Sequence, residues 1–161
     1  MIKVPFFPML FVFLLFPLTG VAAGNITTEN SYVLSANPKT AAAYMELFNS
    51  SSRDDRLVSA ESPYAARVEL HTHTEDANGV MRMQRLDDGI DIPKNESANL
   101  MPGGNHIMLM GLNRELQPEE EIPITLTFEK SAAITLMVSV KTTLSGEETG
   151  HDHSHAHSDS H

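Results

Sequence analysis

Short apolar runs, separated by clusters of Pro, Gly, Asn and Asp, are the feature that most limits the folds available to this chain. Such runs are typical of β-strands that end at turns. The expected strands are 32–34, 42–49, 57–60, 67–74, 80–86, 98–100, 106–112, 122–129 and 133–141. Many short strands with little helix predict an all-β domain, either a β-sandwich or a barrel.

The run 42–49 is the one place where a helix competes. Its Ala, Met, Glu and Leu residues favour helix by intrinsic propensity. However, Pro38 before it and the polar segment 49–52 after it leave room for only a short element. We therefore interpret this run as a strand.

The first 23 residues resemble a secretory signal peptide. Lys3 is followed by the apolar run 9–16 and then by Val21-Ala22-Ala23, which predicts cleavage after Ala23. A membrane anchor is the alternative, but prolines bracket an apolar run shorter than the roughly 20 residues that a span requires. The expected organisation is a signal peptide at 1–23, a folded domain at 24–144 and a tail at 145–161, with no stable membrane anchor after cleavage and a periplasmic or secreted product.

Composition narrows the class of protein. Without Lys3, 10 Lys and Arg face 21 Asp and Glu, and this acidic balance argues against nucleic acid as a partner. The chain contains no Cys, which excludes a disulfide framework and lipid attachment at a cysteine. It also lacks the nucleophile elbow, the phosphate-binding Gly-Lys loop and His-Glu-x-x-His, so we expect no enzyme.

His and Met residues recur at alternating positions, in His71-x-His73, Met81-x-Met83 and the segment His106-x-Met108-x-Met110. In a strand this spacing puts each group on one face. Thioether sulfur adds little for hard cations but suits the polarisable Cu(I) ion. The pattern therefore favours a Cu(I) carrier.

Strand parity gives these groups a place in the domain. Val68 and Leu70 predict one core face and Ile107 and Leu109 another, so the His and Met side chains should lie on the opposite faces, at the outside or rim. The segment 75–79 contains Asn-Gly, a strong hairpin signal, which should fold the Met81 and Met83 strand back beside the His71 strand. The other methionines, Met45, Met101 and Met137, have no histidine at strand spacing, and we expect them to be core residues.

The tail is a different kind of sequence. After the polar linker 145–150 it has no apolar residue larger than alanine, so we expect it to be disordered without metal. Its five histidines could bind divalent metals through neutral imidazoles, and Cu(II) is the expected ion. They are His151, His153, His155, His157 and His161.

Over about residues 36–141 the chain resembles the PCu(A)C family of exported copper chaperones. The segments that carry the resemblance are 42–44, 55–58, 66–71, 79–83, 92–93, 102–104 and 106–112. The resemblance implies a cupredoxin-like Greek-key β-sandwich, without the Cys ligand of blue-copper electron carriers. It also implies that His71, Met83, His106 and Met108 are the Cu(I) ligands.

The spacing departs from the family pattern, His-x10-Met-x21-His-x-Met, by one residue in each gap. Eleven residues separate His71 from Met83, and 22 separate Met83 from His106. Extra residues in the loops need not move the ligands, but Met81 stays open as a substitute for Met83. His73 and Met110 are further accessory candidates.

The function that the resemblance implies is delivery of Cu(I) to a copper protein, typically towards the dinuclear copper centre of cytochrome c oxidase, by contact with that oxidase subunit or another copper chaperone. Separately from the resemblance, the tail histidines could capture Cu(II) and raise the local metal concentration near the Cu(I) site through the short linker. The rivals are a copper buffering, resistance or uptake protein, and a zinc or nickel scavenger that works through the tail.

Overall fold

The computed structural model describes residues 25–141, and this part of the chain is built from strands and loops, with no helix. The ten strands are β1 Ile26–Asn37, β2 Thr40–Asn49, β3 Asp55–Glu61, β4 Ala65–Glu75, β5 Met81–Arg85, β6 Ile90–Ile92, β7 Ser97–Leu100, β8 His106–Leu112, β9 Glu121–Phe128 and β10 Ile134–Lys141. Since residues 25–141 contain no helix, they contain no helix that could cross a membrane. The all-β prediction is confirmed.

All nine expected strands are present, and the competing helix at 42–49 is not. In β2 buried residues alternate with more exposed ones, as expected of a strand with one face on the core. The strand β6, three residues that follow Gly89, is not among the expected strands. Gly89 has φ of 82°, and a side chain there would collide with the Leu57 carbonyl oxygen, so this tight approach of β6 to β3 requires glycine.

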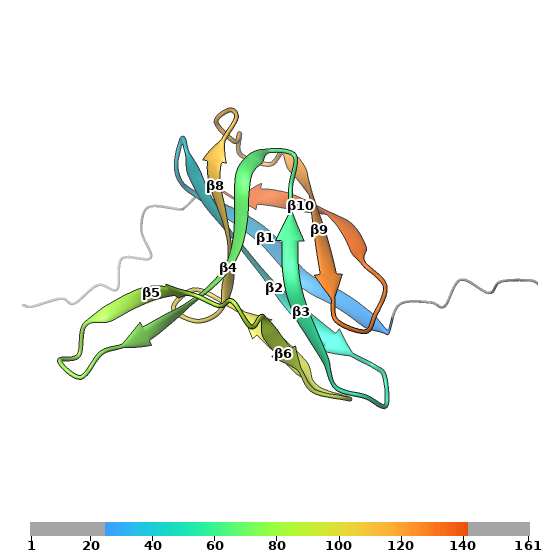
Figure 1. Ribbon diagram of the computed structural model, residues 1–161. Coiled ribbons are helices and arrows are strands. Elements are labelled where there is room, and N and C mark those ends of the chain that lie inside the picture. Colours follow the sequence, from blue (N-terminus) through green and yellow to red (C-terminus); the bar gives the residue numbers. More distant parts are fainter. Residues whose placement is uncertain (1–24, 142–161) are drawn as a thin grey trace, which may run out of the picture.

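The strands form one open hydrogen-bonded sheet in the order β5-β4-β8-β2-β1-β10-β9-β3-β6, with β7 also paired to β2. The sheet bends strongly, so that β4, β8 and β2 lie across from β9 and β3 (Figure 1). The β1–β10 pair is parallel, whereas the other named strand pairs are antiparallel. The strands β5 and β6 form the two edges of the sheet.

The core lies inside this bend and is almost entirely aliphatic. Leu70, Ile107 and Leu109 are buried there, as strand parity predicts. Phe128 is the one buried aromatic residue that contributes to the core among the described residues. Burial of this face fixes the register of β4 and β8, because a shift of one residue would exchange the two faces.

One prediction about the core is wrong in part. Met45 is buried, but Met101 and Met137 are exposed, at 50% and 53%. Met137 lies on the outward face of β10, and Met101 lies in the loop between β7 and β8. Absence of a neighbouring histidine therefore does not identify a core methionine.

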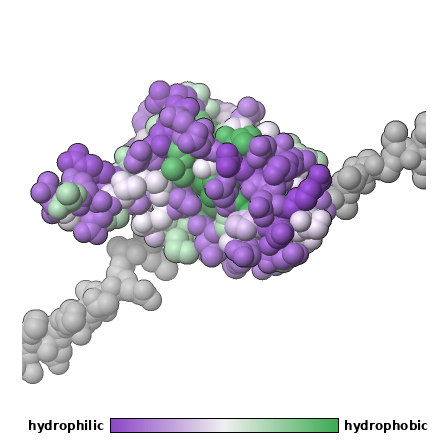
Figure 2. All heavy atoms as spheres, turned by 60° about the horizontal axis from the view of Figure 1, so that its bottom comes forward, coloured by the Kyte–Doolittle hydropathy of each residue, from purple (hydrophilic) through white to green (hydrophobic). Residues whose placement is uncertain are grey.

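The hairpin of β4 and β5 extends beyond the body of the domain. In Figure 2 it forms a separate, mostly hydrophilic lobe. The backbone of Asp76 and Val80 closes its turn with a 3.0 Å hydrogen bond, and Gly79 has φ of 78°. This confirms the predicted hairpin, and all five residues of β5 are exposed.

Candidate metal site

Three neighbouring strands bring the predicted ligands onto one face of the sheet. His71 on β4 is directly opposite His106 on β8, and His73 is directly opposite Met83 on β5. Met108 lies opposite Glu69, two residues from His106 on the same face. Residues far apart in the sequence therefore meet along the β5-β4-β8 ladder.

The His71 ring is oriented by a carboxylate. Its Nε2 lies 2.9 Å from an oxygen of Glu69, and its side chain is only 12% exposed. The other nitrogen, Nδ1, is buried and has no hydrogen-bond partner within residues 25–141. A neutral imidazole that donates through Nε2 keeps a lone pair on Nδ1, which is a free metal ligand.

His106 is oriented by the backbone. Its Nδ1 lies 3.0 Å from the Gly104 carbonyl oxygen, so Nδ1 donates and Nε2 keeps the lone pair. Burial lowers the pKa of His106, and the nearby imidazoles of His73 and His71 lower it further, although the bond to Gly104 opposes the shift. The ring is therefore neutral at neutral pH, the form that binds a metal.

The predicted place of this pair, at the outside or rim of the domain, is wrong for His106, which is only 2% exposed. Its ring is surrounded by other rings on the same face. Tyr44 lies 6.2 Å away between centroids, His71 5.9 Å and His73 5.0 Å. Strand parity assigned His106 to the correct face, but side chains from the neighbouring strands surround it there.

His73 adds a third imidazole. Its ring stacks on that of His106 with an interplanar angle of 26°, and its Nδ1 is also buried and unpartnered among the described residues. Stacked rings do not point lone pairs at one ion. This geometry makes His73 a neighbour of His106 and keeps it an accessory candidate.

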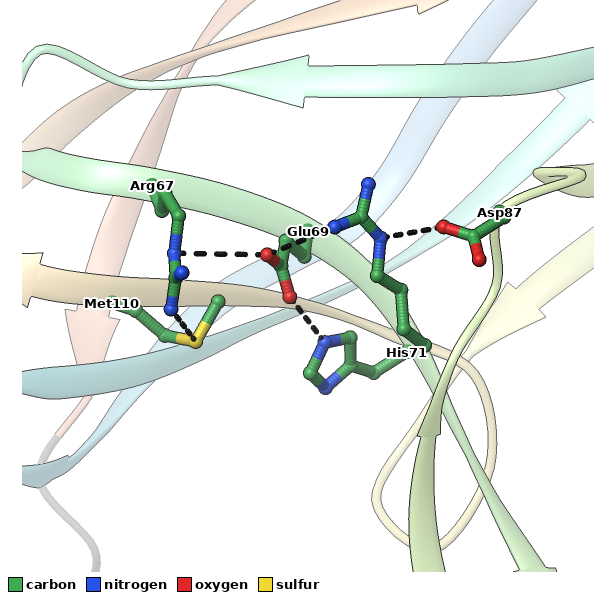
Figure 3. Close-up of polar contacts among 6 residues, drawn as sticks. Arg67, Glu69, His71, Asp87 and Met110 are labelled. Atoms are coloured by element: carbon green, nitrogen blue, oxygen red, sulfur yellow. Dashed lines mark hydrogen bonds and ion pairs between the residues drawn. The ribbon is translucent and has the colours of Figure 1, made fainter.

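The four methionines differ in position and contact. Met83 and Met81 are exposed at 50% and 53%, and Met81 lies about 7 Å further along β5, opposite Glu75. Met108 and Met110 are half-buried, but the Met110 sulfur lies 3.8 Å from a guanidinium nitrogen of Arg67 (Figure 3). By strand register, Met83 and Met108 lie nearer to the histidines than Met81 and Met110 do.

The donor set is informative about the metal. Within residues 25–141, no group of three or more His, Asp or Glu side chains is arranged to hold a metal ion. Beside the two imidazoles, this face carries the thioethers of Met83 and Met108. Such a mixed set suits a soft monovalent ion better than zinc, magnesium or calcium.

Glu69 is the residue whose role the sequence reasoning missed. Parity placed it on the face of His71, but its importance depends on β5, which brings Arg85 within 3.2 Å of it. The bond to His71, followed by the Arg85 and Arg67 charges, lowers the pKa of Glu69 and keeps it ionised. The tail histidines and the signal peptide lie outside the described residues.

The comparison with known proteins identifies the family of this chain. The family model described as "Putative lipoprotein LpqE-like" matches residues 26–140. A curated relative from Leifsonia xyli subsp. xyli, "Putative lipoprotein Lxx21020", is 34% identical over 122 residues, which cover 76% of this chain and 73% of the relative. The chain therefore belongs to the LpqE-like family, a family of PCuAC type.

Two solved structures are similar in fold and sequence. The copper-bound PCuAC domain from PmoF2 is 27% identical, with a TM-score of 0.62 over 75% of this chain and 96% of that domain. The Cu(I) form of DR1885 from Deinococcus radiodurans is 30% identical, with a TM-score of 0.57 over 73% of this chain and 80% of that protein. The resemblance to PCuAC domains is thus confirmed.

Proposed function

We propose that this protein is an exported copper chaperone that holds Cu(I) through His71, His106, Met83 and Met108. The observation that carries the proposal is the direct pairing of His71 with His106, with both methionines on the same face of adjoining strands. The solved relatives described as copper-bound and Cu(I)-bound support the same ion. We also propose that the sheet has the Greek-key topology of cupredoxin-like domains.

The histidines and methionines have different roles. The neutral imidazoles anchor the ion, and the thioethers favour its reduced state. Because Met83 is half exposed on an edge strand, an acceptor protein can approach that ligand first and exchange it for one of its own. This is the behaviour of a carrier and requires no catalysed reaction.

The proposed recipient is the dinuclear copper centre of cytochrome c oxidase, reached directly through its copper subunit or through another copper chaperone. In this proposal residues 1–23 act as a signal peptide that directs export and is cleaved after Ala23. The lipoprotein names of the relatives support export, but these 161 residues contain no cysteine to carry a lipid.

A second part of the proposal concerns the five tail histidines. They capture Cu(II) and raise the local copper concentration near the folded domain through the short linker. The tail thus keeps Cu(II) near the domain, whereas the His/Met site binds Cu(I).

The test is an anaerobic Cu(I) competition titration of the chain from residue 24, with and without residues 146–161. We expect one tight site in both forms, which His106→Ala combined with Met108→Ala abolishes. Met137→Ala is the matched control, since this methionine is also on a strand but is 53% exposed on β10, away from the histidines.

Other outcomes identify the rivals. Loss of all metal binding on removal of the tail would contradict the proposal and indicate a zinc or nickel scavenger. A tight Cu(I) site with no transfer to an oxidase copper subunit or to a second chaperone would indicate a buffering, resistance or uptake protein.

A further inference from the structure

Glu69 occupies a central position beside the proposed copper site. It lies on β4, two residues before His71 and directly opposite Met108. Its side chain is only 15% exposed, although it is charged. A carboxylate so covered requires partners for its oxygens.

Those partners are three side chains, of which Figure 3 labels Arg67 and His71. One oxygen faces two guanidinium groups, with Arg85 at 3.2 Å and Arg67 at 3.6 Å. The other oxygen accepts the hydrogen bond from Nε2 of His71 at 2.9 Å. Arg85 is itself held by Asp87 at 2.7 Å, so the carboxylate is fixed on the side away from the histidine.

The orientation of the carboxylate determines which nitrogen of His71 is available. Nε2 is occupied by Glu69, and the buried Nδ1 has no hydrogen-bond partner in the described part of the chain. At His106 the assignment is reversed, because Gly104 occupies Nδ1. The two paired histidines therefore present different ring nitrogens.

We propose that Glu69 is a positioning residue of the copper site. Its carboxylate, fixed by Arg67 and Arg85, orients the His71 ring so that copper binds Nδ1 of His71 and Nε2 of His106. This inference rests on the proposed function and assigns its ligand atoms. A carboxylate that accepts the second N–H of a metal-binding imidazole fixes its tautomer and makes it a stronger ligand.

The test uses the full chain labelled with ¹⁵N at histidine and titrated anaerobically with Cu(I), which is diamagnetic and allows NMR. Long-range ¹H–¹⁵N spectra report which ring nitrogen of each histidine changes on binding. We expect Nδ1 of His71 and Nε2 of His106 to shift, and Nε2 of His71 to stay protonated.

Variants of Glu69 supply the second measurement. Glu69→Ala should weaken Cu(I) binding about 10- to 100-fold and make the His71 nitrogen signals heterogeneous. Glu69→Gln keeps an oxygen acceptor and should recover part of the affinity and the Nδ1 signature. Glu75→Ala is the matched control, because Glu75 is on the same strand and face but is exposed and pairs with Met81.

The outcomes separate this inference from the proposed function. If wild-type protein binds Cu(I) tightly through Nε2 of His71, or if Glu69→Ala and Glu75→Ala bind equally well, the positioning role is wrong and the chaperone proposal stands. If wild-type protein has no tight Cu(I) site, both fail. If Glu69→Ala does not fold, the wild-type nitrogen assignment and Glu69→Gln still decide.

Discussion

The paired histidines, His71 and His106, differ from Met83 in how far they are exposed to solvent. His106 is buried in the middle of the sheet and His71 is nearly so, and both rings are fixed by hydrogen bonds. Met83 is half exposed on an edge strand of the protruding hairpin. The contrast shows that the fold fixes the two imidazoles of the proposed site and leaves one of its proposed sulfur ligands accessible.

The largest effect should come from the buried side of this contrast. His71→Ala combined with His106→Ala should weaken Cu(I) binding by at least about a thousandfold, or about 4 kcal/mol, because both anchoring nitrogens are removed. Competition titration measures the loss, and thermal unfolding of the metal-free variant checks that it is folded. Retention of wild-type affinity would show that the paired imidazoles are not ligands.

A smaller effect is expected on the exposed side. Met83→Ala should weaken Cu(I) binding about tenfold and speed its release, because one of two thioethers is lost. Met81→Ala is the control of equal size and similar exposure, and it should bind nearly as wild type. If Met81→Ala weakened Cu(I) binding more than Met83→Ala, the sulfur ligand would be Met81, two residues away on β5.

The smallest effect should be on the pH dependence of stability. Burial lowers the pKa of His106, so on mild acidification the unfolded chain takes up a proton at this residue before the folded domain does. Between the ordinary pKa of histidine, about 6.5, and the lower one in the fold, acid therefore favours unfolding. Thermal unfolding of metal-free protein should show a decrease in Tm from pH 7.5 to 5.5.

The control for this decrease is His106→Gln, which has no titrating group at that position. Its Tm should decrease less over the same pH range. An equal or larger decrease in the variant would mean that His106 is not the residue responsible.

Local pattern was enough to predict much of the fold. Alternation around Leu70 and around Ile107 and Leu109 identified the core face, and the Asn-Gly turn identified the β4–β5 hairpin. Long-range pairing was the part that the sequence did not disclose. The burial of His106 depends on Tyr44 from β2, and the role of Glu69 depends on Arg85 from β5.

The short strand β6 was missed for a related reason. Three residues between a turn and Pro93 carry too little pattern to recognise, and β6 exists because β3 pairs with it. The ligand set itself came from the family resemblance, and its nitrogen and sulfur atoms stay predictions until copper binding is measured.

The alternation of side chains along the strands also determines where this domain can tolerate insertions and deletions. The turn at Asp76–Gly79 lies between the His71 strand and the Met83 strand, so its length can change without altering the pairing of His73 with Met83. One residue added between Glu69 and His71 would instead turn His71 and His73 towards the core. The spacing of the motif in the sequence can thus change while the proposed site keeps its geometry, because that geometry depends on which residues pair across the sheet.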